Sequence, residues 1–405
     1  MEKKQTRSFN CKIMSNNILT AIQTVFKREL KRMVSRPIYL LGSVGVMTFC
    51  FVFFLTFFNE GQPAKMPVAV VDIDNSSFSR QFIRNLQTSQ HVDIVEHLHS
   101  FKDAREEMQR GNIYAFVFID RDLYKNTATN RRPVLTFYVN NAYLIAGSLA
   151  AKDISYLSLI TAGGVQRQVL RAKGVNESQI MGIVQPIMVD THLIGNPWAN
   201  YGTYLLNVLL PAMLQLMVLM LTTFSIGVEL KERTSKVWIE TAGNSIFAGL
   251  MGKLLPYTVI FTLLGCTGNL LLYKYMHFPL HSSIGWMFLA TFLLVLAAQA
   301  LGILFIGTLP VLRDAITVAG VFGTLSITAA GATFPVEQLP YFFRTFTSAF
   351  PMRHYSLIYV NQALNGTDIS HSVTKYIILL AFTLLPLFVY KRLKNAAVFM
   401  NNPTK

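Results

Sequence analysis

The residues best suited to chemistry lie between the first and second apolar runs of this chain. His91, His97 and His99 are close in sequence, and Asp72 and Asp74 alternate at the end of a β-like run. Imidazole and carboxylate groups bind metals or transfer protons. The histidines lack cysteine partners and a complete ligand set, however, and aspartates at a strand end commonly cap turns. We therefore predict neither a metal site nor a catalytic carboxylate pair.

The sequence contains no motif for binding or hydrolysing nucleotides. No G-x-x-x-x-G-K-[ST] phosphate loop occurs, and no G-x-G-x-x-G follows a strand. The hydrolase patterns H-E-x-x-H and G-x-S-x-G are absent as well. We predict that the chain is not an enzyme and holds no cofactor, so a separate subunit would bind any ATP and magnesium that power it.

Six apolar runs predict an integral membrane protein. Hydrophobic residues make up 52% of the chain, and each run is near the roughly 20 residues that a helix needs to cross a bilayer. The expected fold class is a polytopic α-helical membrane protein with six transmembrane helices and an inserted α/β (or α+β) extracytoplasmic domain at 59–203. The predicted spans are 38–58, 204–228, 250–273, 284–309, 315–333 and 373–390.

The charge distribution predicts the orientation. The insert has 14 basic and 13 acidic residues, so nearly all of the net charge of +15 lies elsewhere, where it indicates contact with anionic lipid and not with nucleic acid. Nine basic residues precede the first span. The positive-inside rule then places 1–37 in the cytoplasm and the insert outside. Both termini, including the tail 391–405, are expected to be cytoplasmic, in a multi-pass protein of the cell inner (plasma) membrane.

Residues 16–35 predict an amphipathic helix. Apolar residues recur at helical spacing, and Lys27, Arg28, Lys31 and Arg32 gather toward its end. A basic helix of this kind tends to lie in the membrane surface. The alternative is an ordinary N-terminal helix that contacts another protein. Pro37 ends the helix and leads into the first span.

In the insert, segments with the apolar spacing of strands alternate with segments that have the apolar spacing of helices. Apolar β-like segments separated by amphipathic ones argue for a small α/β or α+β domain with its own core. The expected strands are 66–74, 91–98, 113–120, 134–140 and a returning strand at 187–193, and the expected helices are 76–90, 101–111 and 142–172.

Residues 229–240 (ELKERTSKVWIE) join the second and third spans and are dense in charge. A solvated connector needs no tryptophan, whereas a docking helix uses apolar anchors ringed by charge, here Trp238 and Ile239. The segment resembles the E-x-K/R-E-x-G-T stretch, followed by an apolar pair, in permease subunits of ABC type-2 exporters. Arg233 stands where glycine is usual. The resemblance implies a coupling helix that docks on an ATPase subunit through Glu229, Lys231, Glu232, Arg233, Thr234 and Trp238.

A second resemblance to the same family follows the fifth span. Its apolar runs are too short to cross a membrane and are broken by prolines, which predicts helices that dip into the outer leaflet and return, covered by protein. The family pattern F-P-x-E-x-L/M-P, with a later proline, implies a re-entrant outer gate over 334–366. The matching residues are Phe334, Pro335, Glu337, Leu339, Pro340 and Pro351.

The whole layout resembles the subgroup of these permeases with a large extracytoplasmic domain. One span precedes an insert that opens V-A-V-V-D-x-D at 68–74, and five spans follow. That subgroup includes drug exporters and sodium exporters. The resemblance implies drug-type efflux of a hydrophobic or amphipathic substrate. The implied partners are a cytoplasmic ATPase subunit, a second permease copy or paralogue, and a periplasmic adaptor with an outer-membrane channel.

Three polar residues inside the spans are candidates for a substrate pathway: Gln215, Asn269 and Gln299. Such side chains either bond helices together or line a wet path, and the sequence does not separate the two roles. A sodium exporter is a rival interpretation, against which the lack of mid-span carboxylates counts. A non-transporting receptor or scaffold is the rival from another functional class.

Overall fold

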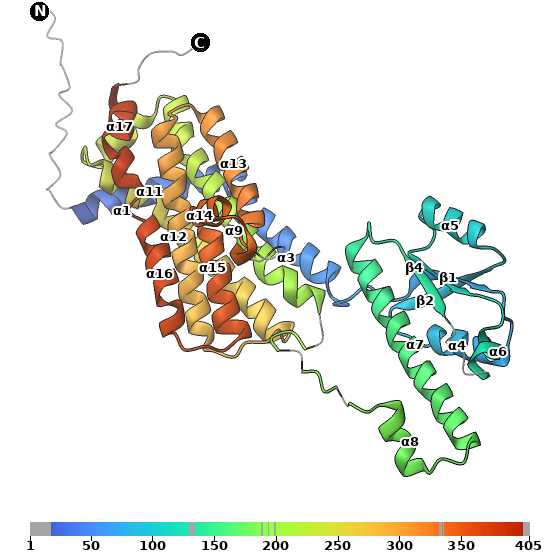
Figure 1. Ribbon diagram of the computed structural model, residues 1–405. Helices are drawn as coiled ribbons and strands as arrows, with labels where there is room; N and C mark the ends of the chain where they lie inside the picture. The colour runs from blue at the N-terminus through green and yellow to red at the C-terminus, as the bar shows by residue number, and fades with distance from the viewer. Residues whose placement is uncertain are drawn as a thin grey trace, which may run out of the picture. The chain divides into compact units, whose positions relative to one another are not determined.

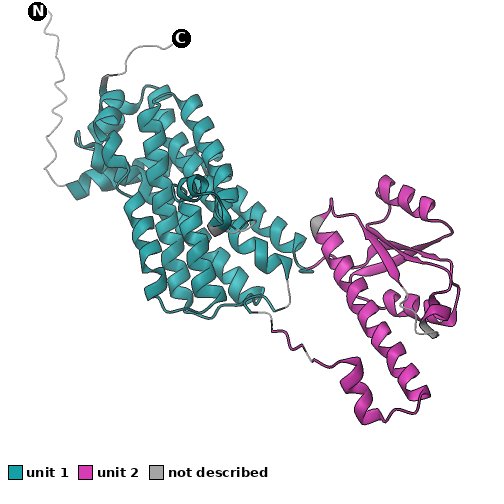
Figure 2. Cartoon of the chain, in the orientation of Figure 1, with its two compact units in different colours: residues 1–61, 193–405 teal, residues 62–192 magenta. Residues whose placement is uncertain are grey.

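The structure is a computed structural model that describes residues 18–128, 134–187, 189–192, 194–197, 200–331, 334 and 336–399. The chain forms two compact units (Figure 2). One comprises residues 62–192, and the other combines residues 1–61 with 193–405. The inserted segment therefore folds on a core of its own.

The inserted unit is built on a four-stranded sheet in the order β2-β1-β3-β4. Strand β1 pairs in parallel with β2 and β3, while β4 runs antiparallel to β3. The four strands predicted before residue 141 are confirmed. The predicted strand at 187–193 lies partly outside the described residues, and 189–192 form no strand. The strands are β1 Met66–Asp72, β2 Val92–Leu98, β3 Ala115–Ile119 and β4 Leu135–Val139.

Helices cover both faces of this sheet, because the central strands bury side chains on each side. Phe82 and Leu86 of α4 and Ile154 of α7 pack with Val68 and Val70 on one face. Ala104 of α5 packs on the other. The helices are α4 Ser77–Gln87, α5 Phe101–Arg110, α6 Leu123–Ala128, α7 Leu144–Ala172 and α8 Glu177–Val184.

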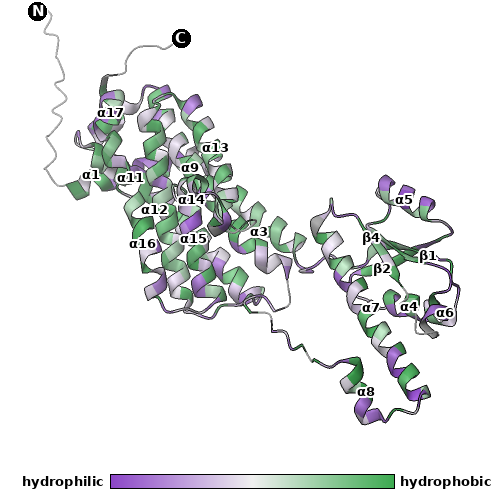
Figure 3. Cartoon of the chain, in the orientation of Figure 1, coloured by the Kyte–Doolittle hydropathy of each residue, from purple (hydrophilic) through white to green (hydrophobic). Residues whose placement is uncertain are grey.

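The second unit is a bundle of helices coloured mostly as apolar in Figure 3. Its elements appear in Figure 1. They are α1 Ile18–Ser35, α2 Pro37–Leu40, η1 Leu41–Gly45, α3 Val46–Phe57, α9 Tyr201–Lys231, α10 Ser235–Thr241, α11 Ile246–Leu270, η2 Leu271–Tyr275, α12 Ile284–Thr308, α13 Leu312–Ala329, η3 Val336–Gln338, α14 Tyr341–Thr347, α15 Pro351–Tyr359, η4 Val360–Leu364, α16 Ser370–Phe382 and α17 Pro386–Phe399.

Five helical segments among the described residues are long and apolar enough to cross a membrane. They coincide with five of the six predicted spans and confirm that these runs form single long helical segments. The sixth, 315–333, falls on α13, an 18-residue helix with Arg313 and Asp314 in its first turn. This helix is not among the five, so the span stays a prediction. The five are Pro37–Phe57, Tyr201–Lys231, Ile246–Tyr275, Ile284–Thr308 and Ser370–Val398.

Glycines allow the helices of the bundle to approach closely. A Cβ on Gly265 of α11 would lie 2.4 Å from the side chain of Thr291 on α12. A Cβ on Gly252 would lie 2.6 Å from the carbonyl oxygen of Ile22, so α1 packs directly on the backbone of α11. Small residues at such crossings bring backbones together and strengthen packing in lipid.

Candidate functional site

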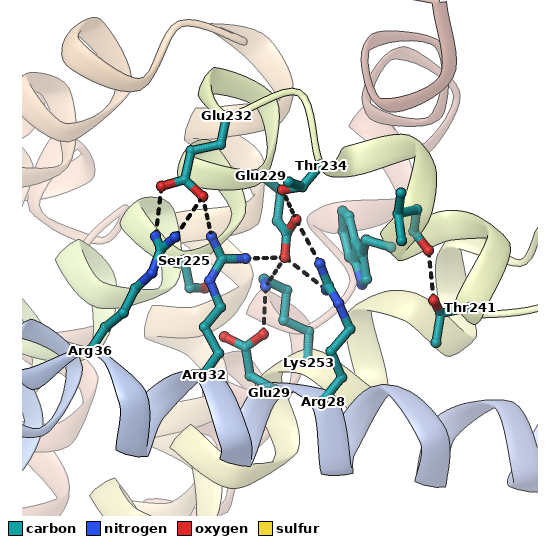
Figure 4. A network of polar contacts seen from close by, with 12 residues as sticks. Arg28, Glu29, Arg32, Arg36, Ser225, Glu229, Glu232, Thr234, Thr241 and Lys253 are labelled. Atoms are coloured by element: carbon teal, nitrogen blue, oxygen red, sulfur yellow. Dashed lines mark hydrogen bonds and ion pairs between the residues drawn. The ribbon is translucent and has the colours of Figure 1, made fainter.

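Helix α1 meets three consecutive segments that lie about 200 residues later in the chain: the last turn of α9, α10 and the start of α11 (Figure 4). A tight turn ends α9. The Thr234 N–H donates to the Glu229 carbonyl (3.0 Å), and the Arg233 N–H donates to that of Leu230 (3.3 Å). Arg233 has a φ of 58°, in the left-handed region that favours glycine at this position of a helix end. The turn redirects the chain into α10.

A buried cation holds three of these segments together. The Lys253 ammonium on α11 lies 2.7 Å from Oε2 of Glu29 on α1 and 3.0 Å from Oε1 of Glu229 on α9. All three side chains are fully buried. The Tyr257 hydroxyl donates to the other oxygen of Glu29 (2.8 Å). Removing one partner of a buried ion pair typically costs about 3–5 kcal/mol, so this arrangement strongly favours one relative placement of the helices.

Three arginines extend the network. Arg28 and Arg32, four residues apart, share one face of α1, and Arg36 follows directly after the end of that helix. Arg28 makes two hydrogen bonds to Glu229 (2.8 and 3.0 Å). Arg32 bonds to Glu229 and to Glu232. Arg36 makes two bonds to Glu232 (2.6 and 3.1 Å) and holds the pKa of that carboxyl below its usual range.

The network adds a contact of α1 that the sequence did not predict. Arg28 and Arg32 of this helix, and Arg36 just after it, bond to carboxylates of this chain, because Glu229 and Glu232 at the end of α9 lie opposite them. The position of the helix in the membrane surface stays a prediction. Lys27 and Lys31, on another side of α1, remain exposed. This helix is therefore attached to the bundle.

Helix α10, part of the predicted coupling segment 229–240, is anchored by side chains that face the bundle. Trp238 is 0% exposed; its Nε1–H donates to the Gly249 carbonyl (3.2 Å), and its ring centroid lies 5.5 Å from the Lys253 ammonium. The interpretation of Trp238 as an outward-facing anchor is thus corrected, because the ring fills the space between α10 and α11. Among the other coupling residues, Lys231, Glu232 and Arg233 are exposed.

The family follows from comparison with known proteins. Residues 37–389 match a family model described as ABC-2 family transporter protein. The chain belongs to this family. It is therefore a multi-pass membrane subunit of an ABC transporter, not itself catalytic, and its family implies a partner ATPase subunit. No curated protein matches it.

The three polar residues within the spans of this permease bond its helices to one another. The Gln215 amide donates to the Ser326 hydroxyl (2.8 Å), joining α9 to α13. Asn269 donates to Thr291 (2.9 Å). The Gln299 oxygen accepts from the Thr258 hydroxyl (2.9 Å). Each side chain thus stabilises helix packing, and a place in a substrate pathway stays a prediction.

The predicted re-entrant segment contains helices too short to cross a membrane. Pro351 is buried at the first turn of α15, where its missing N–H costs nothing. Phe334 and Pro340 are exposed, and Leu339 is half-buried. Pro335 and the Glu337 side chain lie outside the described residues. The aromatic residues Tyr341, Phe342, Phe343 and Phe346 of α14 are exposed.

Among the histidine and aspartate candidates of the inserted unit, His91 and Asp72 have structural partners, while His97 and His99 are exposed. The His91 ring bonds to Asp153 (3.0 Å) and to Gln62 (2.6 Å). An oxygen of Asp72 accepts the Asn75 N–H (3.0 Å) at the end of β1. Within the described ranges, no three metal-ligating side chains come together.

Sequence reasoning missed three members of the charge network. Glu29, Lys253 and Tyr257 were not singled out, although two of them carried a signal. Glu29 is the one carboxylate in a basic helix, and Lys253 is a lysine near the start of an apolar span. A charge in such a position usually has a partner inside the bundle.

Proposed function

We propose that this permease forms the membrane pathway of an ATP-driven exporter of hydrophobic or amphipathic compounds, with a separate subunit binding ATP and magnesium. The observation that carries the proposal is the charge network that joins α1, the end of α9 and α11 beside α10, in a chain whose family implies an ATPase partner. It supports α10 and α1 as the place where the motion of that partner enters the bundle.

The network explains how such a motion would be transmitted. A push on α10 reaches α9 through the turn at Arg233, and reaches α1 and α11 through Glu229 and Lys253. Packed interfaces of this kind shift as rigid bodies between discrete arrangements. The bundle would then open toward the re-entrant segment 334–366, and the substrate would leave there.

The proposed topology has six spans, cytoplasmic termini and the inserted unit outside, where a periplasmic adaptor leading to an outer-membrane channel would meet it. Helix α13 serves as the fifth span, and a second copy or a paralogue covers its outward side. On that side the small residues Thr317 and Thr324 are exposed between the apolar side chains of Val321 and Leu325, and small residues allow a second helix to approach closely.

Vesicle transport tests this function. The permease and its co-purified ATPase subunit are reconstituted together, and efflux of a lipophilic dye is compared with transport of radiolabelled sodium. We expect ATP-dependent dye movement that needs both subunits. Transport of sodium without transport of dye would show that the protein is a sodium exporter instead. If no ATPase subunit co-purifies with the permease, the result would favour a non-transporting receptor or scaffold.

A further inference from the structure

A cavity of about 260 Å³ lies at the end of the bundle where α9 begins. The first turns of α9, the end of α13, and α15 with η4 border it, and all of them belong to one compact unit. The charge network lies at the other end of α9 and does not account for this cavity. An engineered cavity of roughly 150 Å³ in another protein binds benzene, so this cavity has room for a compound of two or three rings.

Apolar side chains make up most of the lining. They are Val208 of α9, Val336 of η3, Leu357 of α15, and Val360 and Leu364 of η4. The rings of Tyr204 and Tyr359 line the cavity as well, and the Tyr359 hydroxyl donates to the Thr203 carbonyl (3.2 Å). Flat rings beside aliphatic groups favour a ligand that is apolar and aromatic.

Two polar side chains of the lining bond to other parts of the chain. The Ser356 hydroxyl donates to the Ala330 carbonyl. The Arg353 side chain is buried, and its guanidinium donates to the Thr347 and Ser348 hydroxyls (2.6 and 2.8 Å), which joins α15 to the end of α14. A charged ligand would lose its hydration here and meet polar groups that already have partners, which makes its binding unfavourable. The cavity therefore favours an uncharged ligand.

We propose that this cavity binds an uncharged, lipophilic compound with aromatic rings and that such compounds are the substrates of the transporter. The inference rests on the proposed function and narrows its substrate class, since charged amphiphiles and hydrated sodium ions bind poorly in an apolar lining. Val336, Leu357 and Val360 belong to the segment 334–366, toward which the bundle would open. The cavity would thus hold the substrate next to its exit.

Photolabelling tests the site. A photo-reactive azide of N-phenyl-1-naphthylamine, an uncharged dye with three rings, is irradiated with full-length permease in nanodiscs, and the labelled residues are identified by mass spectrometry. We expect saturable labelling within 203–208 and 353–364, with competition by the unmodified dye. The compound 8-anilinonaphthalene-1-sulfonate has the same rings and one negative charge. It should compete about tenfold more weakly, because its charge would be buried, and sodium chloride should not compete.

Filling the cavity tests it independently. Leu357→Trp places a larger side chain in the lining and should reduce saturable labelling about tenfold. Val360→Phe, at a position that is 37% exposed, enlarges the lining with less strain and should give a smaller loss. Leu263→Trp, at an exposed position of α11, is the control and should be labelled like the wild type.

The labelling needs neither ATP nor the ATPase subunit. Labelling outside the cavity, equal competition by the sulfonate, or unchanged labelling of both cavity variants would overturn the inference. Labelling with which the unmodified dye does not compete would overturn it too, because a lipid chain in the cavity or dye dissolved in the bilayer gives that result. A wild type that binds the dye in the cavity but moves no dye with ATP in vesicles would instead refute the proposed function and leave the binding site in place.

Discussion

Replacing Lys253 by methionine should destabilise the permease more than any surface change. Methionine has a similar length and fits a buried position, but it leaves Glu29 without its cation and Glu229 with only its arginines. Loss of one partner of a buried pair costs about 3–5 kcal/mol. Arginines still bond to Glu229, so the main penalty is the unpaired buried charge of Glu29. We expect the free energy of unfolding to fall by about 3 kcal/mol.

A second substitution separates charge from packing. Glu29→Gln removes the orphaned charge and keeps an oxygen that can accept from the Tyr257 hydroxyl. The double variant Glu29→Gln/Lys253→Met should therefore recover about 2 kcal/mol relative to Lys253→Met, the size of coupling found for residues in direct contact.

The free energy of unfolding in mixed micelles, measured by circular dichroism against increasing dodecyl sulfate, reports these changes. Lys274→Met, an exposed site in η2 following α11, is the matched control and should change stability little. A Lys253→Met variant as stable as the control, or a double variant no more stable than Lys253→Met, would refute the reasoning about the buried cation.

Three further predictions concern local structure. Gly252→Ala places a methyl group against Val25 and should lower the free energy of unfolding by about 1–3 kcal/mol. Gly320→Ala, at a position with open space around it, is the control. An equal effect of the two substitutions would contradict the close packing of α1 on α11. Arg233→Gly should raise unfolding free energy by about 1 kcal/mol by relieving the left-handed backbone, which an unchanged midpoint would exclude. Hydrogen bonds from Arg171 and Arg167 lower the pKa of Glu177, so the α7–α8 contact should be stable at neutral pH and weaken as pH falls below about 4.5; hydrogen exchange of α8 that does not rise in acid would count against this.

The sequence predicts the membrane architecture well because long apolar runs have few alternatives. Runs such as 284–309 must satisfy their backbones as helices in lipid, and α12 spans Ile284–Thr308. Helix α13 shows the limit of this reasoning: Arg313 and Asp314 in its first turn, together with its threonines and glycines, dilute the apolar signal.

The charge network was beyond sequence reasoning because its members meet only in the folded bundle. Glu29 and Lys253 are 224 positions apart, and neither has a motif. The orientation of Trp238 was missed for a related reason. Helix α10 has only seven residues. Its sequence shows that Trp238 is apolar, but it does not show whether the ring packs against this chain or against another protein.

The coupling efficiency of the assembled transporter tests the central claim most directly. Arg28→Met/Arg32→Met removes bonds between α1 and Glu229, while Lys27→Met/Lys31→Met neutralises exposed neighbours on the same helix. In vesicles holding permease and ATPase subunit, dye exported per ATP hydrolysed should fall sharply for the arginine variant and stay near the wild-type value for the lysine variant. An arginine variant that exports as much dye per ATP as the wild type would contradict transmission of ATPase motion through this network.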